Sequence, residues 1–347
     1  MAVEKISFLN IRKTSEAHYK FIPQTNIIIG QNGVGKTTII ETLFLLSTSK
    51  SFRKKQNRAL LKEGKKHIQA KGSFINKTEK KTIKILIEKN KKTITKNKEK
   101  IKKTSDLLSE NPMVCMSPEE VDIIEAYKGE KIKYFDKIIF KTNKNYIENI
   151  KTYNKFLLYR NLLLEQQKPT EVWDEQISKE GIIVWKERKR NIKELIKTFK
   201  KVQKKIGAEE YEIEYISSEI EEKQKYIEKL QKKENREKTK TGPHADTFVF
   251  RKNKKNLQEH GSQGEKKLFK HILKLAEAEF LKKQNKTVPI LLLDDFFDKL
   301  DSKNIMKIFV YFHCKFQTII TTTETNEDII KKTLGVEEKQ IKIIKCQ

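Results

Sequence analysis

Alternating and periodic apolar positions predict a mixed α/β segment at the start of the chain. Residues 3 to 11 and 26 to 29 are typical of strands, and the second run ends in three consecutive isoleucines before Gly30. Apolar residues then recur at helical spacing from residue 37 to about residue 46. Isoleucines alternate with polar residues from 83 to 87, which predicts a β-meander with turns near residues 76 and 90.

The pattern becomes helical after about residue 110. Apolar residues at helical spacing are Tyr146, Ile150, Tyr153 and Leu157, and then Ile192, Leu195, Phe199, Val202 and Ile206. We interpret both sets as core faces of long helices that pack on each other, rather than as interaction surfaces. A dense run of Lys and Glu from 219 to 238 indicates a solvated helix face or a mobile tip.

An α/β pattern returns near residue 247. It predicts a helix from 264 to 281, a buried strand from 289 to 293 and a last strand from 317 to 321. Both ends of the chain therefore contribute to one α/β unit.

A glycine-rich segment between the second strand and the first helix matches the P-loop pattern G-x-x-x-x-G-K-S/T. Its residues are Gly30, Gln31, Asn32, Gly33, Val34, Gly35, Lys36, Thr37 and Thr38. Glycines let the backbone N–H groups point inward at phosphate oxygens, and the helix that follows adds its positive N-terminus. In such loops the lysine, here Lys36, reaches the outer phosphates of ATP, and the hydroxyl of Thr37 ligates Mg²⁺.

A second motif lies roughly 260 residues later, where the apolar run 290 to 293 ends in Asp294 and Asp295. A buried strand that ends in acids has the Walker B pattern. Asp294 is the expected Mg²⁺ ligand through water, and Asp295 is expected to orient the attacking water.

The segment Gly261-Ser262-Gln263-Gly264-Glu265 opens the helix that precedes Walker B. It resembles the signature motif of ABC-type ATPases, whose core is Ser-x-Gly-Gln or Ser-x-Gly-Glu. In that family the motif grips the γ-phosphate held on a partner's P-loop, so Ser262, Gly264 and Glu265 are expected to bind nucleotide in trans. Asp295 replaces the usual Glu, and Thr321-Thr322-Thr323 stands where many members keep a switch histidine. We therefore expect slow hydrolysis.

These motifs predict an α/β fold: an ABC-type P-loop ATPase head, with a mixed sheet, flanking helices and an antiparallel β subdomain, plus an inserted α-helical lobe. The expected domains are residues 1–110 and 240–347 for the head and 111–239 for the lobe.

Composition changes the picture in three respects. The 347 residues carry a formal net charge of +28, which favours polyanionic partners, although Lys, Ile and Asn are over-used throughout, as an AT-rich genome would produce. The three cysteines, Cys115, Cys314 and Cys346, show no metal or disulfide spacing, so we expect a reducing, cytoplasmic setting. No apolar run approaches the ~20 residues of a membrane span, so no membrane partner is expected.

Further segments resemble the RecF family, bacterial recombination-mediator ATPases related to SMC proteins. The matching segments, in order, begin at Leu9-Asn10-Ile11-Arg12, Lys50-Ser51-Phe52-Arg53, Ser117-Pro118-Glu119-Glu120, Tyr159-Arg160-Asn161, Trp173-Asp174 and Gly242-Pro243-His244. The resemblance runs nearly end to end, although Ala245 and Thr247 depart from the family's G-P-H-R-D-D motif. It implies that Arg12 also serves the nucleotide site.

The same resemblance implies a function. The family binds DNA as an ATP-bound homodimer, favours gaps with single-strand/double-strand junctions, and helps RecO and RecR place RecA on single-stranded DNA. It implies recombinational repair and replication restart, with a weak DNA-stimulated ATPase. Candidate DNA contacts are Lys54, Lys55, Arg58 and Lys62.

Three alternatives remain open from the residues. A nucleotide-binding subunit of a membrane transporter would need a switch histidine and a coupling surface. An SMC-like chromosome organiser would need far longer coiled-coil arms than residues 111–239 provide. A diverged homologue would bind ATP without turnover.

Overall fold

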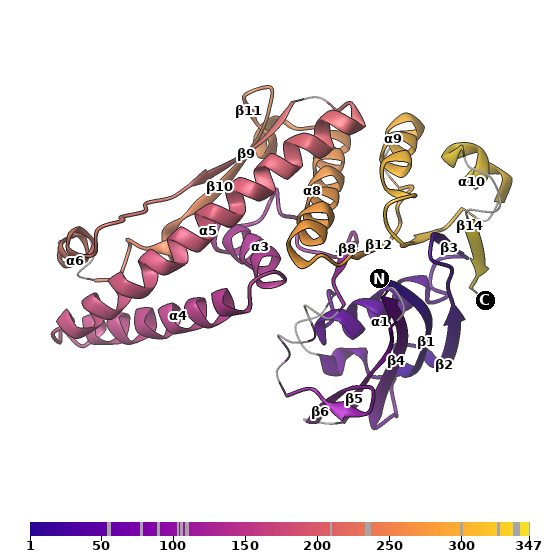
Figure 1. Cartoon of the computed structure of the whole chain (residues 1–347), viewed down its shortest axis with the longest axis horizontal. Coiled ribbons are helices and arrows are strands. Elements are labelled where there is room, and N and C mark those ends of the chain that lie inside the picture. The colour runs from indigo at the N-terminus through magenta and orange to yellow at the C-terminus, as the bar shows by residue number, and fades with distance from the viewer. Residues whose placement is uncertain are drawn as a thin grey trace. The chain divides into compact units, whose positions relative to one another are not determined.

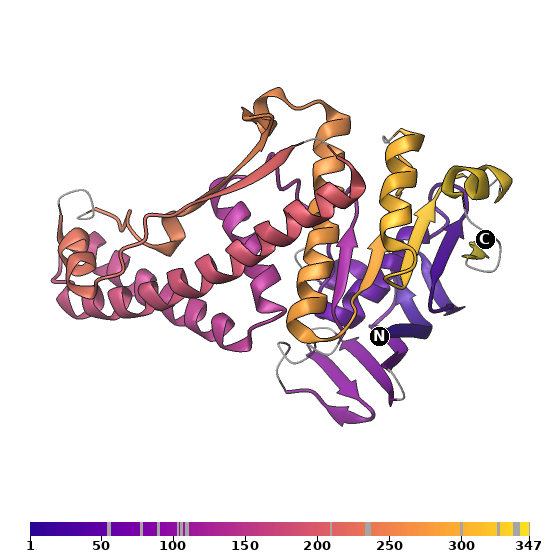
Figure 2. The same ribbon diagram turned by 45° about the horizontal axis from the view of Figure 1, so that its top comes forward.

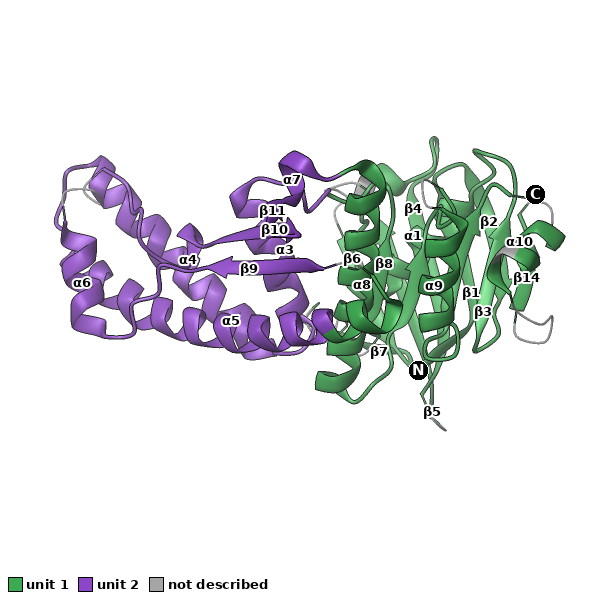
Figure 3. Ribbon diagram, turned by 90° about the horizontal axis from the view of Figure 1, so that it is seen from above, with its two compact units in different colours: residues 1–121, 201–208, 262–347 green, residues 122–200, 209–261 purple. Residues whose placement is uncertain are grey.

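The computed structural model describes residues 1–53, 57–76, 79–88, 91–102, 104, 107, 111–208, 210–232, 237–298, 301–324, 327–335 and 341–346. These residues form two compact units (Figure 3). Unit 1 contains Met1–Val121, Lys201–Ala208 and Ser262–Gln347, and unit 2 contains Asp122–Lys200 and Glu209–Gly261.

A six-stranded antiparallel sheet forms one layer of unit 1, in the order β2-β1-β4-β5-β6-β7. Its strands are β1 (Ala2–Ile11), β2 (Thr14–Lys20), β4 (His67–Asn76), β5 (Glu79–Glu88), β6 (Lys91–Lys96) and β7 (Glu99–Lys100). A short 3-10 helix, Asn57–Leu60, precedes β4. Ile83 and Ile85 of β5 are fully buried, so the predicted alternation places one face of this meander in the core.

A five-stranded parallel sheet forms the second layer, in the order β14-β3-β13-β12-β8. Its strands are β3 (Thr25–Ile29), β8 (Met113–Met116), β12 (Ile290–Leu293), β13 (Thr318–Thr322) and β14 (Ile341–Lys345). Every residue of β3, β12 and β13 is buried, as expected for parallel strands covered on both faces.

Helix α1 (Lys36–Thr48) lies between the two sheets, and α8 (Gln263–Asn285) and α9 (Ser302–Phe312) cover the other side of the parallel sheet (Figure 1). Helix α10 (Glu327–Leu334) packs against α9. The apolar side chains of α1 and of both sheets form one buried cluster, which includes Ile39, Leu43 and Ile319. This core fixes where β3 ends and α1 begins, and hence the shape of the loop between them.

Unit 2 contains α3 (Lys128–Phe140), α4 (Lys144–Glu165), most of α5 (Glu171–Ile206) and α6 (Lys223–Gln231). It also holds a three-stranded sheet, β11-β10-β9, made of β9 (Tyr211–Ile216), β10 (Thr247–Lys252) and β11 (Lys255–Asn256). The short helices Pro243–Ala245 and α7 (Leu257–His260) complete it. The inserted lobe is therefore not purely helical.

A buried polar network holds unit 2 together. Arg188 on α5 is ion-paired with Asp136 on α3 at 3.0 Å and with Asp246 at 2.7 Å, and it donates to the carbonyl of Pro243 at 2.6 Å. Asp246 also accepts from the indole N–H of Trp185 at 3.0 Å. Pro243 and Asp246 belong to the motif that begins at Gly242, so this motif is part of the interior of unit 2.

The structure departs from the sequence-based expectations in the boundaries of the two units and in the strands. Residues 111–121 and 201–208, expected in the inserted lobe, belong to unit 1. Residues 240–261 belong to unit 2 rather than to the C-terminal part of the head, because β10 pairs with β9 along its whole length. The strand at 318–322 is not the last one, because β14 follows it and pairs with β3. None of the helices in the described ranges combines the length and the apolar character needed to cross a bilayer.

Candidate nucleotide-binding site

The P-loop connects the end of β3 to the start of α1, as its sequence predicts. Gly33 and Gly35 have φ values of 85° and 105°, in the left-handed region that L-residues disfavour. The ammonium of the buried Lys36 donates to the carbonyls of Gly30 and Gln31, at 2.7 and 2.8 Å. The loop therefore curls around the lysine head group, while Asn32 stays exposed at its crest.

Asp294 lies at the carboxyl end of β12, and three hydroxyl groups from separate elements donate to its carboxylate. Thr37 of α1 and Thr321 of β13 donate to Oδ1 at 3.1 and 2.7 Å, and Ser117, which follows β8, donates to Oδ2 at 3.0 Å. Parallel strands end at one edge of a sheet, so β8, β12 and β13 deliver these groups to the P-loop side. The structure thus brings together Thr37 and Asp294, the two predicted metal ligands.

Asp295 follows Asp294 directly, and its backbone adopts the left-handed conformation with a φ of 49°. Its N–H donates to the Thr321 hydroxyl at 3.0 Å. Burial raises the pKa of the Asp295 carboxyl, the neighbouring charge of Asp294 adds to this rise, and Lys36 opposes it. Asp295 therefore holds a proton at higher pH than an ordinary aspartate, which suits a group that handles protons.

Ser262, Gly264 and Glu265 lie at the start of α8, whereas the P-loop precedes α1. The Ser262 hydroxyl accepts from the N–H of Glu265 at 3.3 Å, and the Glu265 carboxylate accepts from the N–H of Ser262 at 2.8 Å. This capping box fixes the helix start. Gln263 and Gly264 are exposed, and a Cβ at Gly264 would meet no atom within 4 Å among the described residues.

Arg12 is engaged with α1 rather than with the P-loop backbone. Its guanidinium donates to both carboxylate oxygens of the buried Glu41, at 3.1 and 3.0 Å. Ser51 also donates to Glu41. Whether Arg12 touches nucleotide remains a prediction, and the structure gives it a role in fixing the P-loop helix against β1.

Sequence reasoning missed two of the residues at this site. Ser117 opens a segment that carried only a family resemblance, and Glu41 looks like one more polar residue on a helix. Neither has a local signal, because its partner is distant in the sequence: Asp294 for Ser117 and Arg12 for Glu41.

Of the four candidate DNA contacts, Lys62 is the one whose side chain the structure describes. Lys54, Lys55 and the side chain of Arg58 lie outside the described residues. The half-buried Lys62 donates to the Ser15 hydroxyl at 2.5 Å.

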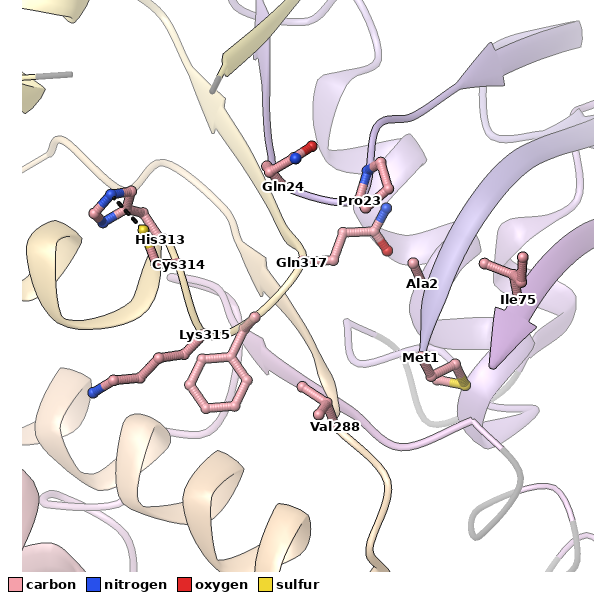
Figure 4. A pocket seen from close by; sticks show the side chains of 11 residues that line it. Met1, Ala2, Pro23, Gln24, Ile75, Val288, His313, Cys314, Lys315 and Gln317 are labelled. Carbon is pink, nitrogen blue, oxygen red and sulfur yellow. Dashed lines mark hydrogen bonds between the residues drawn. The ribbon is translucent and has the colours of Figure 1, made fainter. Parts of the chain in front are cut away.

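A cavity of about 520 Å³ lies at the opposite edge of the parallel sheet (Figure 4). Gln24 and Gln317, which line it, directly precede β3 and β13, and Val288 lies two residues before β12. The P-loop and Asp294 instead follow β3 and β12. Gln317 is also structural, because its amide donates to the carbonyl of Val3 at 2.8 Å and joins β1 to the parallel sheet. This cavity is therefore separate from the candidate nucleotide site.

The chain is similar to known proteins along nearly its whole length. Residues 2–345 match the RecF/RecN/SMC N terminal domain family. The DNA replication and repair protein RecF of Clostridium botulinum (strain Langeland / NCTC 10281 / Type F) is 34% identical over 359 residues, covering 99% of this chain and 98% of the relative. That of Azobacteroides pseudotrichonymphae is 32% identical, covering 94% and 92%.

Solved structures show the same similarity. A structure described as the recombination mediator protein RecF with ATP in the RecFOR pathway superposes with a TM-score of 0.83 at 28% identity, covering 94% of this chain and 92% of that one. An Smc head domain from Pyrococcus furiosus has a TM-score of 0.53 at 14% identity and covers 95% and 91%, which shows a shared fold.

Proposed function

This chain belongs to the RecF family, and from that premise we propose that it is an ATP-dependent clamp on DNA that closes when two copies pair over ATP. The observation that carries the proposal is the direct contact of Thr37 with Asp294, 3.1 Å apart. It joins the P-loop to Walker B at the point where a nucleotide and its metal would meet.

The site has the shape and chemistry that ATP with Mg²⁺ requires. Gly33 and Gly35 provide left-handed turns without a Cβ, so backbone N–H groups can face phosphates. A hydroxyl and a carboxylate, from Thr37 and Asp294, are the oxygen ligands that Mg²⁺ prefers. Residues 30–38 would hold the phosphates, and Mg²⁺ would supply neutralisation of the charge on their oxygens.

A slow ATPase follows from the acids that this chain presents. Lys36 would stabilise the phosphate charge, and Asp295 would accept a proton from a water that it orients. An aspartate is shorter than the glutamate usual at this place, and Thr321 rather than a histidine contacts both acids. We therefore propose weak turnover that DNA stimulates.

The start of α8 supports the proposal that two copies pair over ATP. Ser262 and Gly264 lie at a helix N-terminus, where N–H groups and the helix dipole favour anions. Because Gly264 is exposed with free space beside it, the γ-phosphate held by a second copy could approach this helix end. ATP would then join the two copies.

The biological setting of the proposal rests on the relatives. One related structure belongs to the RecFOR pathway, and the curated relatives carry replication and repair names. We propose recombinational repair and replication restart at gaps, with RecO and RecR as partners and RecA as the protein loaded. Because the chain covers 98% of its Clostridium relative, it matches a whole RecF protein, which argues against an SMC-like chromosome organiser with long arms. A cytoplasmic setting is part of this proposal, since the curated relatives are DNA replication and repair proteins.

Light scattering with a non-hydrolysable ATP analogue and Mg²⁺ tests the clamp. The parent should double its mass with the analogue, and Lys36→Ala should bind no nucleotide and stay a monomer. Ser262→Arg should bind the analogue normally yet stay a monomer, because its side chain would occupy the place of the partner's phosphate. A Ser262→Arg protein that pairs as well as the parent would show that the mechanism is wrong.

A further inference from the structure

Helix α5 carries a row of lysines in its unit 2 portion. The exposed members, which we call the basic stripe, are Lys179, Lys186, Lys193, Lys197 and Lys200. Figure 2 shows α5 as the long helix of unit 2. The stripe belongs to unit 2, whereas the nucleotide site belongs to unit 1.

The spacing places these lysines on one face of the helix. They are separated by seven, seven, four and three residues, so at ~100° per residue they fall within a sector of roughly 60°. From Lys179 to Lys200 the stripe extends ~32 Å along the axis, at about 1.5 Å per residue.

None of the stripe lysines has an ion pair with an acid in the described ranges, whereas neighbours on α5 do. Lys189 pairs with Glu219 at 2.5 Å, and Arg190 pairs with Glu187 at 2.7 Å. The half-buried acids of this part of α5, Glu180, Glu187 and Glu194, repeat every seven residues along another line. Between Lys179 and Lys200 the acids of α5 thus lie on a different line from the stripe.

The apolar face of α5 is already used within the protein. Val184, Trp185, Ile192, Leu195 and Phe199 are each no more than 1% exposed. A helix that lies in a bilayer surface needs a continuous apolar face free to enter the lipid, whereas the exposed large apolar side chains of α5 in the described structure are only Val172 and Ile183, in separate turns. The stripe therefore presents five charges with little accompanying apolar surface, which fits the sugar-phosphate backbone of a nucleic acid.

We propose that the basic stripe of α5 contacts the phosphate backbone of duplex DNA beside the gap. This inference rests on the proposed DNA-binding function and assigns part of that binding to unit 2. The ~32 Å length is close to one ~34 Å turn of B-form DNA, so several lysines can reach phosphates of one duplex. Such contacts position the duplex and carry no sequence preference.

The salt dependence of binding tests the proposal. The quadruple variant Lys186→Gln, Lys193→Gln, Lys197→Gln, Lys200→Gln is compared with the parent on a gapped duplex, with ATP, between 50 and 200 mM salt. A matched control, Lys168→Gln, Lys223→Gln, Lys238→Gln, Lys255→Gln, removes the same charge from exposed lysines elsewhere in unit 2. Nucleotide binding and thermal midpoints are measured for all three proteins.

Each phosphate contact contributes ~0.9 to the log–log salt slope, so the stripe variant should lose about 3 to 4 of that slope while the control loses less than about 1. Equal losses in both variants would show that binding follows net charge and not the stripe. A stripe variant with the parent's slope, or one that loses affinity for anionic vesicles or an acidic protein but not for DNA, would also overturn the proposal. Failure of the parent itself to bind DNA would instead refute the proposed function.

Discussion

The hydroxyl of Thr321 lies 2.7 Å from Oδ1 of Asp294 and donates to it. The hydroxyl oxygen of Thr321 also accepts a hydrogen bond from the N–H of Asp295, at 3.0 Å. One threonine of β13 therefore fixes both acids at the end of β12, from the place where related ATPases often carry a switch histidine.

Replacing Thr321 with valine should weaken the site while keeping the strand. Asp294 loses a donor and the Asp295 N–H loses its acceptor in a buried position, which should cost ~1–3 kcal/mol of the free energy of unfolding. We expect weaker Mg²⁺-dependent ATP binding, measured by titration calorimetry. Thr322→Val is the control, because its hydroxyl accepts from the N–H of Glu324 instead; equal effects from the two variants would contradict the assignment.

Replacing Asp295 with asparagine should make the protein more stable while slowing ATP turnover. Burial and Asp294 raise the Asp295 pKa in the folded protein, so the folded state favours the protonated form. The stability gained from that proton is present at low pH and is lost as pH rises through the folded pKa. Asp295→Asn should therefore raise the thermal midpoint at pH 7, with a smaller gain at pH 4.

The same variant should lose ~10²–10⁴-fold in phosphate release if Asp295 acts as a general base. In the parent, turnover should fall at acid pH earlier than an ordinary aspartate would cause, because the Asp295 pKa is raised. Phosphate release against pH, with Asp295→Glu as the conservative comparison, measures both effects. A parent-like rate in Asp295→Asn would exclude the role.

Replacing Gly264 with alanine should weaken the ATP-dependent pairing of two copies without destabilising the single copy. The Cβ meets no atom within 4 Å in the described structure, and alanine is a better helix former by ~1 kcal/mol, so the monomer should be as stable or slightly more stable. If the partner's γ-phosphate needs this space, ATP-dependent pairing should weaken by tenfold or more. Analytical ultracentrifugation with the ATP analogue measures pairing, and undiminished pairing would show that the helix start stays clear of the phosphate.

Replacing Arg188 with methionine should destabilise unit 2. The change leaves the carboxylates of Asp136 and Asp246 buried without their cation, which should cost ~3–5 kcal/mol. Arg190→Met on the same helix is the control, because Arg190 is exposed and its ion pair with Glu187 contributes at most ~1 kcal/mol. Urea unfolding followed by tryptophan fluorescence should report the difference, since Trp185 bonds to Asp246.

Much of the fold could be predicted because its signals are local. The apolar run before Gly30, the helical repeat after it and the buried run before Asp294 each follow from a period of two or 3.6 residues. The sheet in unit 2 escaped detection because β9 and β10 are separated in the sequence by a charged segment with α6, and their pairing depends on contacts that sequence distance hides. Strand β14 was missed for the same reason, since its partner β3 lies at the other end of the chain.

By itself, the sequence determined the P-loop, Walker B and the capped start of α8, because each is a short run whose backbone geometry and chemistry depend on neighbours in the chain. Only the tertiary structure decided that Ser117, Thr37 and Thr321 meet on one carboxylate, because that requires the ends of β8, β12 and β13 to lie at one edge of a sheet. It also decided that Asp246 is buried against Arg188 and that the lysines of α5 face solvent. Those outcomes depend on which face of each element the core takes up, and packing settles that choice.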